Sequence, residues 1–264
     1  MKTLDSLDWL VIGIYFLVLV AVAIWVIRKK QSSTEDYFLA GRNIGWFVIG
    51  ASIFASNIGS EHVVGLAGAG ASNKLPMLIY EIHAWIVLIL GWVFLPFYAR
   101  SGVFTMPEFL EKRFDARSRW VLSVFSLVAY VLTKISVTIY AGGVVVSALL
   151  GINFWTGALA TVILTGLYTV LGGMRAVVYT EAIQTVILII GAASLTYIGL
   201  EHVGGWQSMT ETVTPQYLNM WRSASDADFP WPSLVISSTI VGIWYWCTDQ
   251  YIVQRALTAK NLKE

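Results

Sequence analysis

Cysteine and charge are the two things that this sequence has least of. It has one cysteine, Cys247, among 264 residues, which excludes an intrachain disulfide framework and a cysteine-rich metal site. Only 12% of the residues are charged and 57% are hydrophobic, whereas an average soluble domain is about one quarter charged. The net charge of +1 gives no sign of a nucleic-acid partner. The composition therefore indicates an integral membrane protein.

Sequence motifs for several kinds of chemistry are also missing. There is no Walker A sequence for ATP-driven transport, no HExxH zinc motif and no serine nucleophile with an evident partner histidine. The pairs Glu61-His62 and Glu81-x-His83 are followed by no third zinc ligand. We therefore expect no enzyme activity.

Long hydrophobic runs, in contrast, recur along the whole chain. A helix needs about 20 apolar residues to cross a bilayer. Runs of this kind predict an all-α membrane protein with seven spans, at 7–27, 46–71, 77–98, 119–149, 153–171, 178–200 and 232–254. The first run is too long for a cleaved signal peptide, and its basic residues follow it rather than precede it. We therefore keep it as a helix.

The basic residues are divided unequally between the two sides that these spans define. One side receives only Lys2, Lys74 and Arg222, and Lys134 lies inside a span. The other side receives Arg28, Lys29, Lys30, Arg42, Arg100, Lys112, Arg113, Arg117, Arg119, Arg175, Arg255, Lys260 and Lys263. Because cytoplasmic loops are rich in lysine and arginine, we expect the N-terminus outside the cell membrane and residue 264 in the cytoplasm.

Ionisable and amide side chains lie within or at the edge of these apolar spans. A charge at the bilayer centre costs about 2.5–3.5 kcal/mol even on a lenient scale, so such residues are rarely accidental. Interhelix hydrogen bonds are one reason to keep them and a ligand site is the other. The residues concerned are Asn57, Glu61, His62, Glu81, His83, Lys134, Glu181 and Asp249.

The second span combines such residues with glycine. A helix that is interrupted in mid-membrane leaves backbone carbonyls that a buried ion or ligand can satisfy. Gly59 beside Ser60 is the expected hinge, whereas close helix packing explains Gly65, Gly68 and Gly70. The segment therefore predicts a broken helix with a binding site, as in a gradient-driven transporter.

The polar residues of this span fall on two faces if the helix is continued through it. Ala55, Ile58 and His62 would share one face, and Asn57 and Glu61 would share the other. We expect the first face to offer carbonyls to a cation and the second to offer side chains to a polar solute or a neighbouring helix.

Aromatic residues stand near the middle of the last span. Trp244, Tyr245 and Trp246 are consecutive, about 100° apart on a helix, so they cannot all face one ligand. An aromatic ring with a polar rim suits a sugar, which is apolar on its C–H face and polar at its edge. An interfacial aromatic belt is the alternative, but such belts lie near helix ends. The pattern favours ligand contact by Tyr245 or Trp246.

Four stretches of the sequence are long and distinctive: "STEDYFLAGRNIGWFVIGASIFASNIGSEHVVGLAGAGA" (33–71), "VFTMPEFLEKRF" (103–114), "YTVLGGMRAVVYTEAIQTVI" (168–187) and "WYWCTDQYIVQRALTAKN" (244–261). They resemble the solute:sodium symporter family, most closely its sodium/glucose cotransporter branch. The resemblance runs over nearly the whole chain. It implies the fold of the leucine-transporter group, with two five-helix repeats of inverted topology after an extra N-terminal helix.

The resemblance also divides the chain. Residues 7–27 would form the extra helix, 46–200 the first repeat and 201–231 an extracellular loop. Residues 232–264 would open the second repeat and reach the cytoplasm, all within one transmembrane domain, 1–264. A family member would continue for several more helices, with further sodium and sugar ligands beyond residue 264. We therefore expect residues 1–264 alone to insert but not to transport.

Roles for a neutral solute follow from the resemblance residue by residue. Asn57, His62 and Glu81 match sugar-contacting positions of the family. Tyr245 and Trp246 match its aromatic platform near the inner side of the sugar. His62 with Glu81 also favours a hydroxyl-rich neutral solute, because a buried carboxylate repels an anion.

Roles in gating and ion binding follow in the same way. Leu66 and Tyr80 match the outer gate of the family, and Ala55 and Ile58 match the backbone carbonyls that bind its main sodium ion. Glu181 stands where the family commonly has aspartate, at a position linked to coupling or to a second cation.

The resemblance implies sodium-coupled symport of a sugar by alternating access, with Na⁺ as the coupling ion. Two alternatives stay open. One is the same fold carrying another solute, such as myo-inositol, an amino acid or an organic acid. The other is a sugar-sensing or channel-like member that binds but does not accumulate.

Overall fold

The computed structural model describes residues 4–29 and 33–263. Lys2 and Lys30 of the charge count, and Glu264, lie outside the described residues. The described helices, in chain order, are α1 (Ser6–Ile27), α2 (Thr34–Leu39), η1 (Ala40–Arg42), α3 (Trp46–Asn57), η2 (Glu61–Leu66), α4 (Ala67–Asn73), η3 (Met77–Ile86), α5 (Val87–Ile89), η4 (Leu90–Phe94), α6 (Leu95–Ser101), α7 (Met106–Arg113), α8 (Ala116–Ala129), η5 (Tyr130–Ile135), α9 (Ser136–Leu150), α10 (Phe154–His202), α11 (Gly205–Thr212), η6 (Pro215–Leu218), α12 (Trp231–Cys247) and α13 (Gln250–Ala256).

The helix ends follow ordinary capping chemistry. Ser33, Thr105 and Asp115 each accept a hydrogen bond from a backbone N–H in the first turn of α2, α7 and α8. Gly102 and Gly151 end α6 and α9 in the left-handed conformation, which glycine adopts without strain. Within the described ranges the only β pairing is an isolated bridge between Ile44 and Ala259. The all-α prediction is therefore confirmed.

The number of spans is not confirmed as seven. By length and composition, four helical stretches of the described chain can cross a membrane: Ser6–Ile27, Met77–Ser101, Ala116–Leu150 and Phe154–His202. A fifth is the bent pair Trp46–Asn57 and Glu61–Asn73, if the pair is one span. α12, the last predicted span, has 17 residues and is shorter than these.

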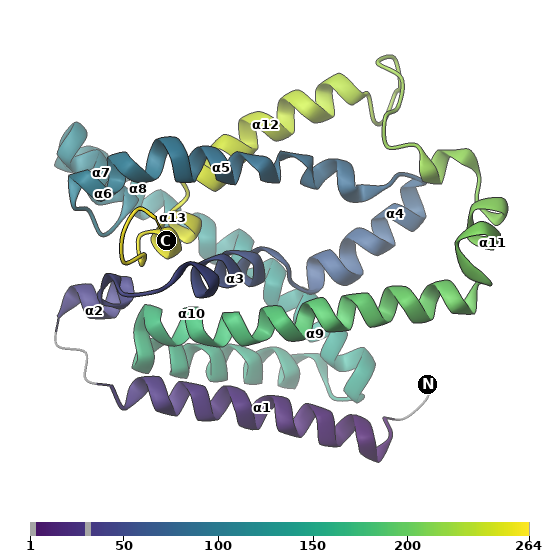
Figure 1. Ribbon diagram of the computed structural model, residues 1–264, viewed down its shortest axis with the longest axis horizontal. Helices are drawn as coiled ribbons and strands as arrows, with labels where there is room; N and C mark the ends of the chain where they lie inside the picture. Colours follow the sequence, from purple (N-terminus) through teal and green to yellow (C-terminus); the bar gives the residue numbers. More distant parts are fainter. Residues whose placement is uncertain (1–3, 30–32, 264) are drawn as a thin grey trace.

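α10 contains the turn that was expected between residues 171 and 178. Its 49 residues include Gly173, which has φ 58° and ψ −160°. These angles lie outside the helical region, and glycine adopts them far more easily than other residues do. Figure 1 shows the consequence as two ribbons that run back alongside each other from a sharp turn. The two apolar halves of α10 therefore correspond to the separate runs predicted at 153–171 and 178–200.

The connections gather at two ends of the bundle (Figure 1). At one end the segment before α3 is tied to distant parts of the chain: Arg175 donates to the Ala40 carbonyl (2.8 Å) and Arg42 donates to the Val103 carbonyl (3.1 Å). The backbone of Ile44 exchanges hydrogen bonds with Thr258 and Lys260. The basic segments assigned to one side by sequence therefore do meet at one end, although which end faces the cytoplasm stays a prediction.

The opposite end is held by the long connection after α10. Tyr217 donates to the Ala71 carbonyl (3.1 Å), and Arg222 donates to the Lys74 carbonyl. Leu75, Met77 and Ile79 form a small buried cluster there. The loop predicted at 201–231 therefore packs over the end of α4 and the start of η3.

The largest buried cluster lies where the helices from η3 to α7 meet α12 and α13. Ile86, Leu90, Trp246 and Cys247 are among its members. Elsewhere much of the helix surface is apolar and exposed, as along Ala116–Leu150. Such surfaces suit a hydrocarbon environment or further protein.

Candidate functional site

The first element of the site is the break between α3 and η2. α3 ends at Asn57, Ile58 has extended backbone angles (φ −112°, ψ 104°), and the helix resumes at Glu61. The axes on the two sides differ by 52°. The predicted break in this span is therefore confirmed, although the extended residue is Ile58, just before the expected hinge, and Ser60 already has helical backbone angles.

The break changes the hydrogen bonds of two carbonyls. In a continuous helix the Gly59 N–H would donate to Ala55 and the His62 N–H to Ile58. Here the Gly59 N–H points to His62 Nδ1 at 3.5 Å, and the His62 N–H donates to the Gly59 carbonyl at 3.0 Å. The carbonyls of Ala55 and Ile58 are thus released from their helical partners.

The break also corrects one expectation. Asn57 belongs to α3 and Glu61 to η2, so these two residues do not share a face of one helix. For the same reason, His62 does not continue the face of Ala55 and Ile58. The ideal-helix spacing fails because the chain is extended between Asn57 and Glu61.

A second break faces the first one. α12 ends at Cys247, and α13 begins at Gln250. The Tyr245 hydroxyl donates to Asn57 Oδ1 (2.5 Å), and the Tyr251 hydroxyl donates to the Ser56 carbonyl (3.1 Å). Two tyrosines, one on each side of the second break, therefore connect it to the end of α3.

Asn57 uses both its amide nitrogen and its amide oxygen in contacts within the protein. Its amide nitrogen donates to the Ile53 carbonyl (2.6 Å) while its oxygen accepts from Tyr245. A solute that contacts either group must compete with these bonds or share them. Asn57 and Tyr245 were predicted as separate sugar contacts, and the structure brings them together.

His62 and Glu81 form a second polar pair. His62 Nε2 lies 3.5 Å from Glu81 Oε1, and His62 Nδ1 lies 4.0 Å from Glu61 Oε1. Both side chains of the closer pair are partly exposed. A carboxylate can accept hydrogen bonds from hydroxyl groups, and an imidazole can donate through one nitrogen and accept through the other. Glu81 also lines a cavity of about 450 Å³ with Leu66.

Other predicted residues lie apart from these pairs. Trp246 is buried in the main core, with its ring centroid 6.5 Å from that of His83, whereas the neighbouring Trp244 is half exposed. The three consecutive aromatics thus face different surroundings, as their spacing predicts. Tyr80 is 37% exposed and does not line the cavity of Leu66 and Glu81. The gate role of Leu66 and Tyr80 stays a prediction.

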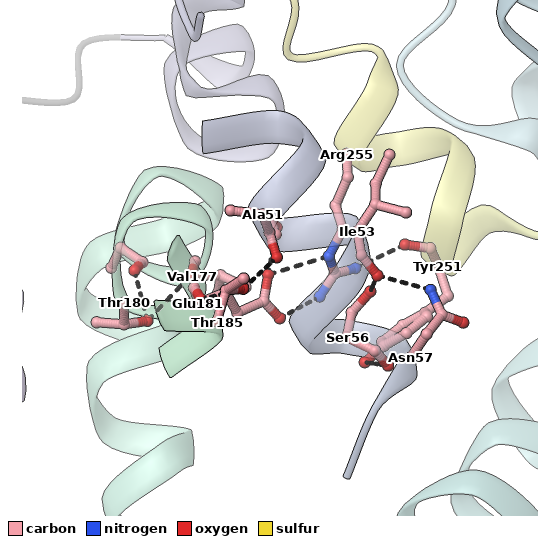
Figure 2. Close-up of polar contacts among 12 residues, drawn as sticks. Ala51, Ile53, Ser56, Asn57, Val177, Thr180, Glu181, Thr185, Tyr251 and Arg255 are labelled. Carbon is pink, nitrogen blue, oxygen red and sulfur yellow. Dashed lines mark hydrogen bonds and ion pairs between the residues drawn. The ribbon is translucent and has the colours of Figure 1, made fainter. Parts of the chain in front are cut away.

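Glu181 is engaged by a buried arginine (Figure 2). Arg255 donates to both oxygens of the Glu181 carboxylate, at 2.6 and 3.1 Å, and the Ser52 hydroxyl donates to it as well. Both side chains of the ion pair are largely buried, at 5% and 12% exposure. The Thr185 hydroxyl donates to the Ala51 carbonyl beside them (2.6 Å). The group ties α10 to α3 and α13.

Sequence reasoning missed several residues that the structure places around Glu181 and the second break. Arg255 was assigned to a cytoplasmic segment, and Ser52 and Tyr251 were given no role. Lys134 and Asp249 were recognised only as costly residues inside spans. The available signal was Glu181, because a carboxylate inside an apolar span needs a partner such as an arginine.

Comparison with known proteins decides the family. The family model described as "Sodium:solute symporter family" matches residues 37–264. The chain belongs to the sodium:solute symporter family. It is 44% identical over 283 residues to sodium/glucose cotransporter 1 of Oryctolagus cuniculus, covering 98% of this chain and 43% of that protein. It is 39% identical over 288 residues to the sodium/myo-inositol cotransporter of Homo sapiens, covering 98% of this chain and 40% of that protein.

A solved structure of this type has the same fold. It is the substrate-bound outward-open state of a Na⁺-coupled sialic acid symporter, with a TM-score of 0.85 and 21% identity over 98% of this chain and 55% of that one. The leucine-transporter-like fold expected from the sequence is therefore confirmed. The chain spans less than half the length of the curated relatives named above.

Proposed function

We propose that this chain belongs to a membrane symporter that couples sodium entry to sugar uptake by alternating access. The observation that carries the proposal is the release of the Ala55 and Ile58 carbonyls at the first break. Carbonyl oxygens at an unwound helix suit Na⁺, and α3 is half-buried at this point. The related proteins are sodium cotransporters by name, which are transport proteins rather than enzymes.

The sugar would bind next to the sodium ion. Glu81 and His62 would accept and donate hydrogen bonds to its hydroxyl groups, with Asn57 at the end of α3. Tyr245 would offer a ring face and Trp246 would support it from the core. Leu66 and Tyr80 would close over the solute from outside once the two helix arms approach.

Coupling follows from the position of the first break. Sodium at Ala55 and Ile58 would fix the angle between α3 and η2, and this angle places His62 against Glu81. A transmembrane potential supplies about 2.3 kcal/mol per charge per 100 mV. Glu181, already paired with Arg255, would take part by relaying the state of α3 to α10. The repeat boundaries, with 46–200 as the first repeat, and the outside N-terminus belong to the same proposal.

A polyol other than glucose is the second candidate. The match to a sodium/myo-inositol cotransporter is nearly as strong as that to the sodium/glucose cotransporter, and both solutes are neutral and hydroxyl-rich. An anionic solute is disfavoured because Glu61 and Glu81 lie on either side of His62.

The test is solute uptake into proteoliposomes. The chain would be joined to the part of the rabbit cotransporter that the match does not cover, and labelled glucose, galactose, myo-inositol, an amino acid and an organic acid would be offered. We expect uptake of a sugar or of myo-inositol with external sodium and none with potassium. The matched control is the same fusion carrying Glu81→Ala. Sodium-independent uptake, or uptake of only the charged solutes, would overturn the proposal.

A further inference from the structure

Lys134 is a charged residue for which the proposed function has no use. It lies on η5, in the middle of the apolar stretch Ala116–Leu150, and lines a cavity of about 380 Å³ together with Glu61 and Asp249. Its Nζ is buried but has no hydrogen-bond partner among the described residues, and it lies 3.9 Å from Asp249 Oδ2. An ammonium in a membrane protein needs compensation from other contacts.

The Asp249 carboxylate supplies part of that compensation, and two aromatic rings supply the rest. Lys134 Nζ lies 3.3 Å from the ring centroid of Tyr251 and 4.9 Å from that of Tyr245. Cation–π attraction acts within about 6 Å of the centroid and is strongest where water is excluded. These are the same tyrosines whose hydroxyls reach Ser56 and Asn57 across the two helix breaks.

Asp249 is bound by η5, the same helical turn that carries Lys134. Tyr130, four residues before Lys134 on η5, donates its hydroxyl to the Asp249 carboxylate. Asp249 is 4% exposed and also accepts from the Tyr251 N–H at the start of α13. η5 is a π-helical turn, a feature that often marks a functional position in a longer helix. One turn of η5 therefore contacts the second break through two side chains.

We propose that Lys134 is a positioning residue that holds the rings of Tyr245 and Tyr251, and through them both helix breaks, against the helix of residues 116–150. Contacts of an ammonium with ring faces have no strict direction, so they can hold the breaks without fixing one exact geometry. The open cavity beside Lys134 means that attraction rather than close packing keeps the ammonium in place. Its consequence for transport rests on the proposed function, but its structural test does not.

The test uses Cys247, the single cysteine of the sequence, as a reporter. Cys247 is fully buried and lies directly before the second break. The rate at which N-ethylmaleimide labels it in the 264-residue chain, reconstituted in lipid nanodiscs, measures how often the break opens. We expect Lys134→Met, which keeps the apolar stem, to raise this rate about tenfold. Lys134→Arg keeps the cation over the rings and should restore the rate to near that of the parent chain.

Two further variants make the test specific. Thr133→Val alters the neighbouring residue of η5, whose hydroxyl only reaches the Ala129 carbonyl, and should leave the labelling rate unchanged. Tyr251→Leu removes the ring from the other side of the contact, together with the hydroxyl bond to the Ser56 carbonyl and the ring contact of Arg255, so its rate should be at least that of Lys134→Met. In the Tyr251→Leu background, Lys134→Met should raise the rate by less than it does in the parent chain, because the main ring contact of Lys134 is already gone.

Several outcomes would overturn the inference. They are a parental rate in Lys134→Met, an equal increase in Thr133→Val, or additive increases in the double variant. If Lys134→Met does not fold, the comparison of Tyr251→Leu with Tyr251→Phe decides, since phenylalanine keeps the ring. The labelling experiment needs no sugar. If sugar uptake fails but the labelling rates are as expected, the proposed function is wrong and the inference about Lys134 still holds.

Discussion

At the break after α3 the carbonyls of Ala55 and Ile58 have lost their helical partners, whereas at the break after α12 the protein supplies partners for the freed groups. The Trp244 carbonyl accepts from the N–H groups of Thr248 and Asp249, and the Cys247 carbonyl accepts from the Tyr98 hydroxyl (2.8 Å). The second break is also buried, with Asp249 capping the helix that follows.

The difference teaches that an interrupted helix is not in itself a binding site. Both breaks occur in apolar helices and both carry polar residues, yet only the first leaves carbonyls that an added cation can satisfy. The second break is closed by its own hydrogen bonds and is suited to a mechanical role. Changes at the first should therefore alter ligand binding, and changes at the second should alter stability.

The largest effect is expected at the buried ion pair behind the second break. Arg255→Met would leave the Glu181 carboxylate buried with only Ser52 as a donor, which costs about 3–5 kcal/mol. The double variant Arg255→Met with Glu181→Gln should regain much of this loss. The stability of both variants can be measured by heating them in detergent and recording the amount of protein that stays monodisperse. A stable Arg255→Met chain would show that the second break does not depend on this pair.

Glu81→Ala sharpens the comparison from the other side. Losing a charged acceptor for a hydroxyl costs about 1.5–3 kcal/mol, so sugar affinity should fall roughly tenfold to a hundredfold. Sodium affinity and thermal stability should change little, because Glu81 is partly exposed and its partner His62 keeps contact with the backbone of Gly59. Equilibrium binding to the fusion described above gives both affinities. Unchanged sugar affinity would remove Glu81 from the site.

Tyr245 belongs to both regions and should show a mixed effect. Tyr245→Phe loses the hydrogen bond to Asn57 within the protein but keeps the ring, so it should cost about 0.5–1.5 kcal/mol in unfolding free energy and reduce sugar affinity only mildly. Tyr245→Ala loses the ring as well and should be clearly weaker. Isothermal titration of the two variants makes the comparison. Equal losses would mean that the hydroxyl, and not the ring face, is the important group.

Thr248→Val should have the smallest effect. It removes the hydroxyl that donates to the Trp244 carbonyl (2.8 Å), but that carbonyl keeps two backbone donors. A loss of about 0.5 kcal/mol in unfolding free energy is expected, with sugar and sodium binding unchanged. Denaturant titration of the purified chain detects it. A loss of sodium binding in this variant would mean that the second break carries an ion as well.

The sequence predicts the breaks and turns better than the contacts between them. Gly59 and the turn at Gly173 follow from local rules, because glycine and apolar run length act within a few residues. The pairing of Glu181 with Arg255 spans 74 residues and depends on how α3, α10 and α13 pack. The same holds for Lys134 over Tyr251. Such tertiary contacts leave no local pattern, so the sequence indicates only that a partner is needed.

Trp246 illustrates the limit of spacing arguments. Helical geometry requires that Tyr245 and Trp246 point in different directions, and that expectation is met. It does not say which of them faces the site. The core formed by η3, η4 and α12 takes Trp246, and Tyr245 is left to meet Asn57.

The bridge between Ile44 and Ala259 has a consequence for how the protein is made. Ile44 forms its backbone hydrogen bonds with Thr258 and Lys260, which leave the ribosome more than two hundred residues later. At about 5–20 residues per second, the segment waits roughly 10–40 s for these partners. The end of the bundle that holds α2 is therefore completed only after α13 has been synthesised. In a chain that stalls before residue 258, the backbone of Ile44 lacks these partners, and cellular quality control can recognise the incomplete end.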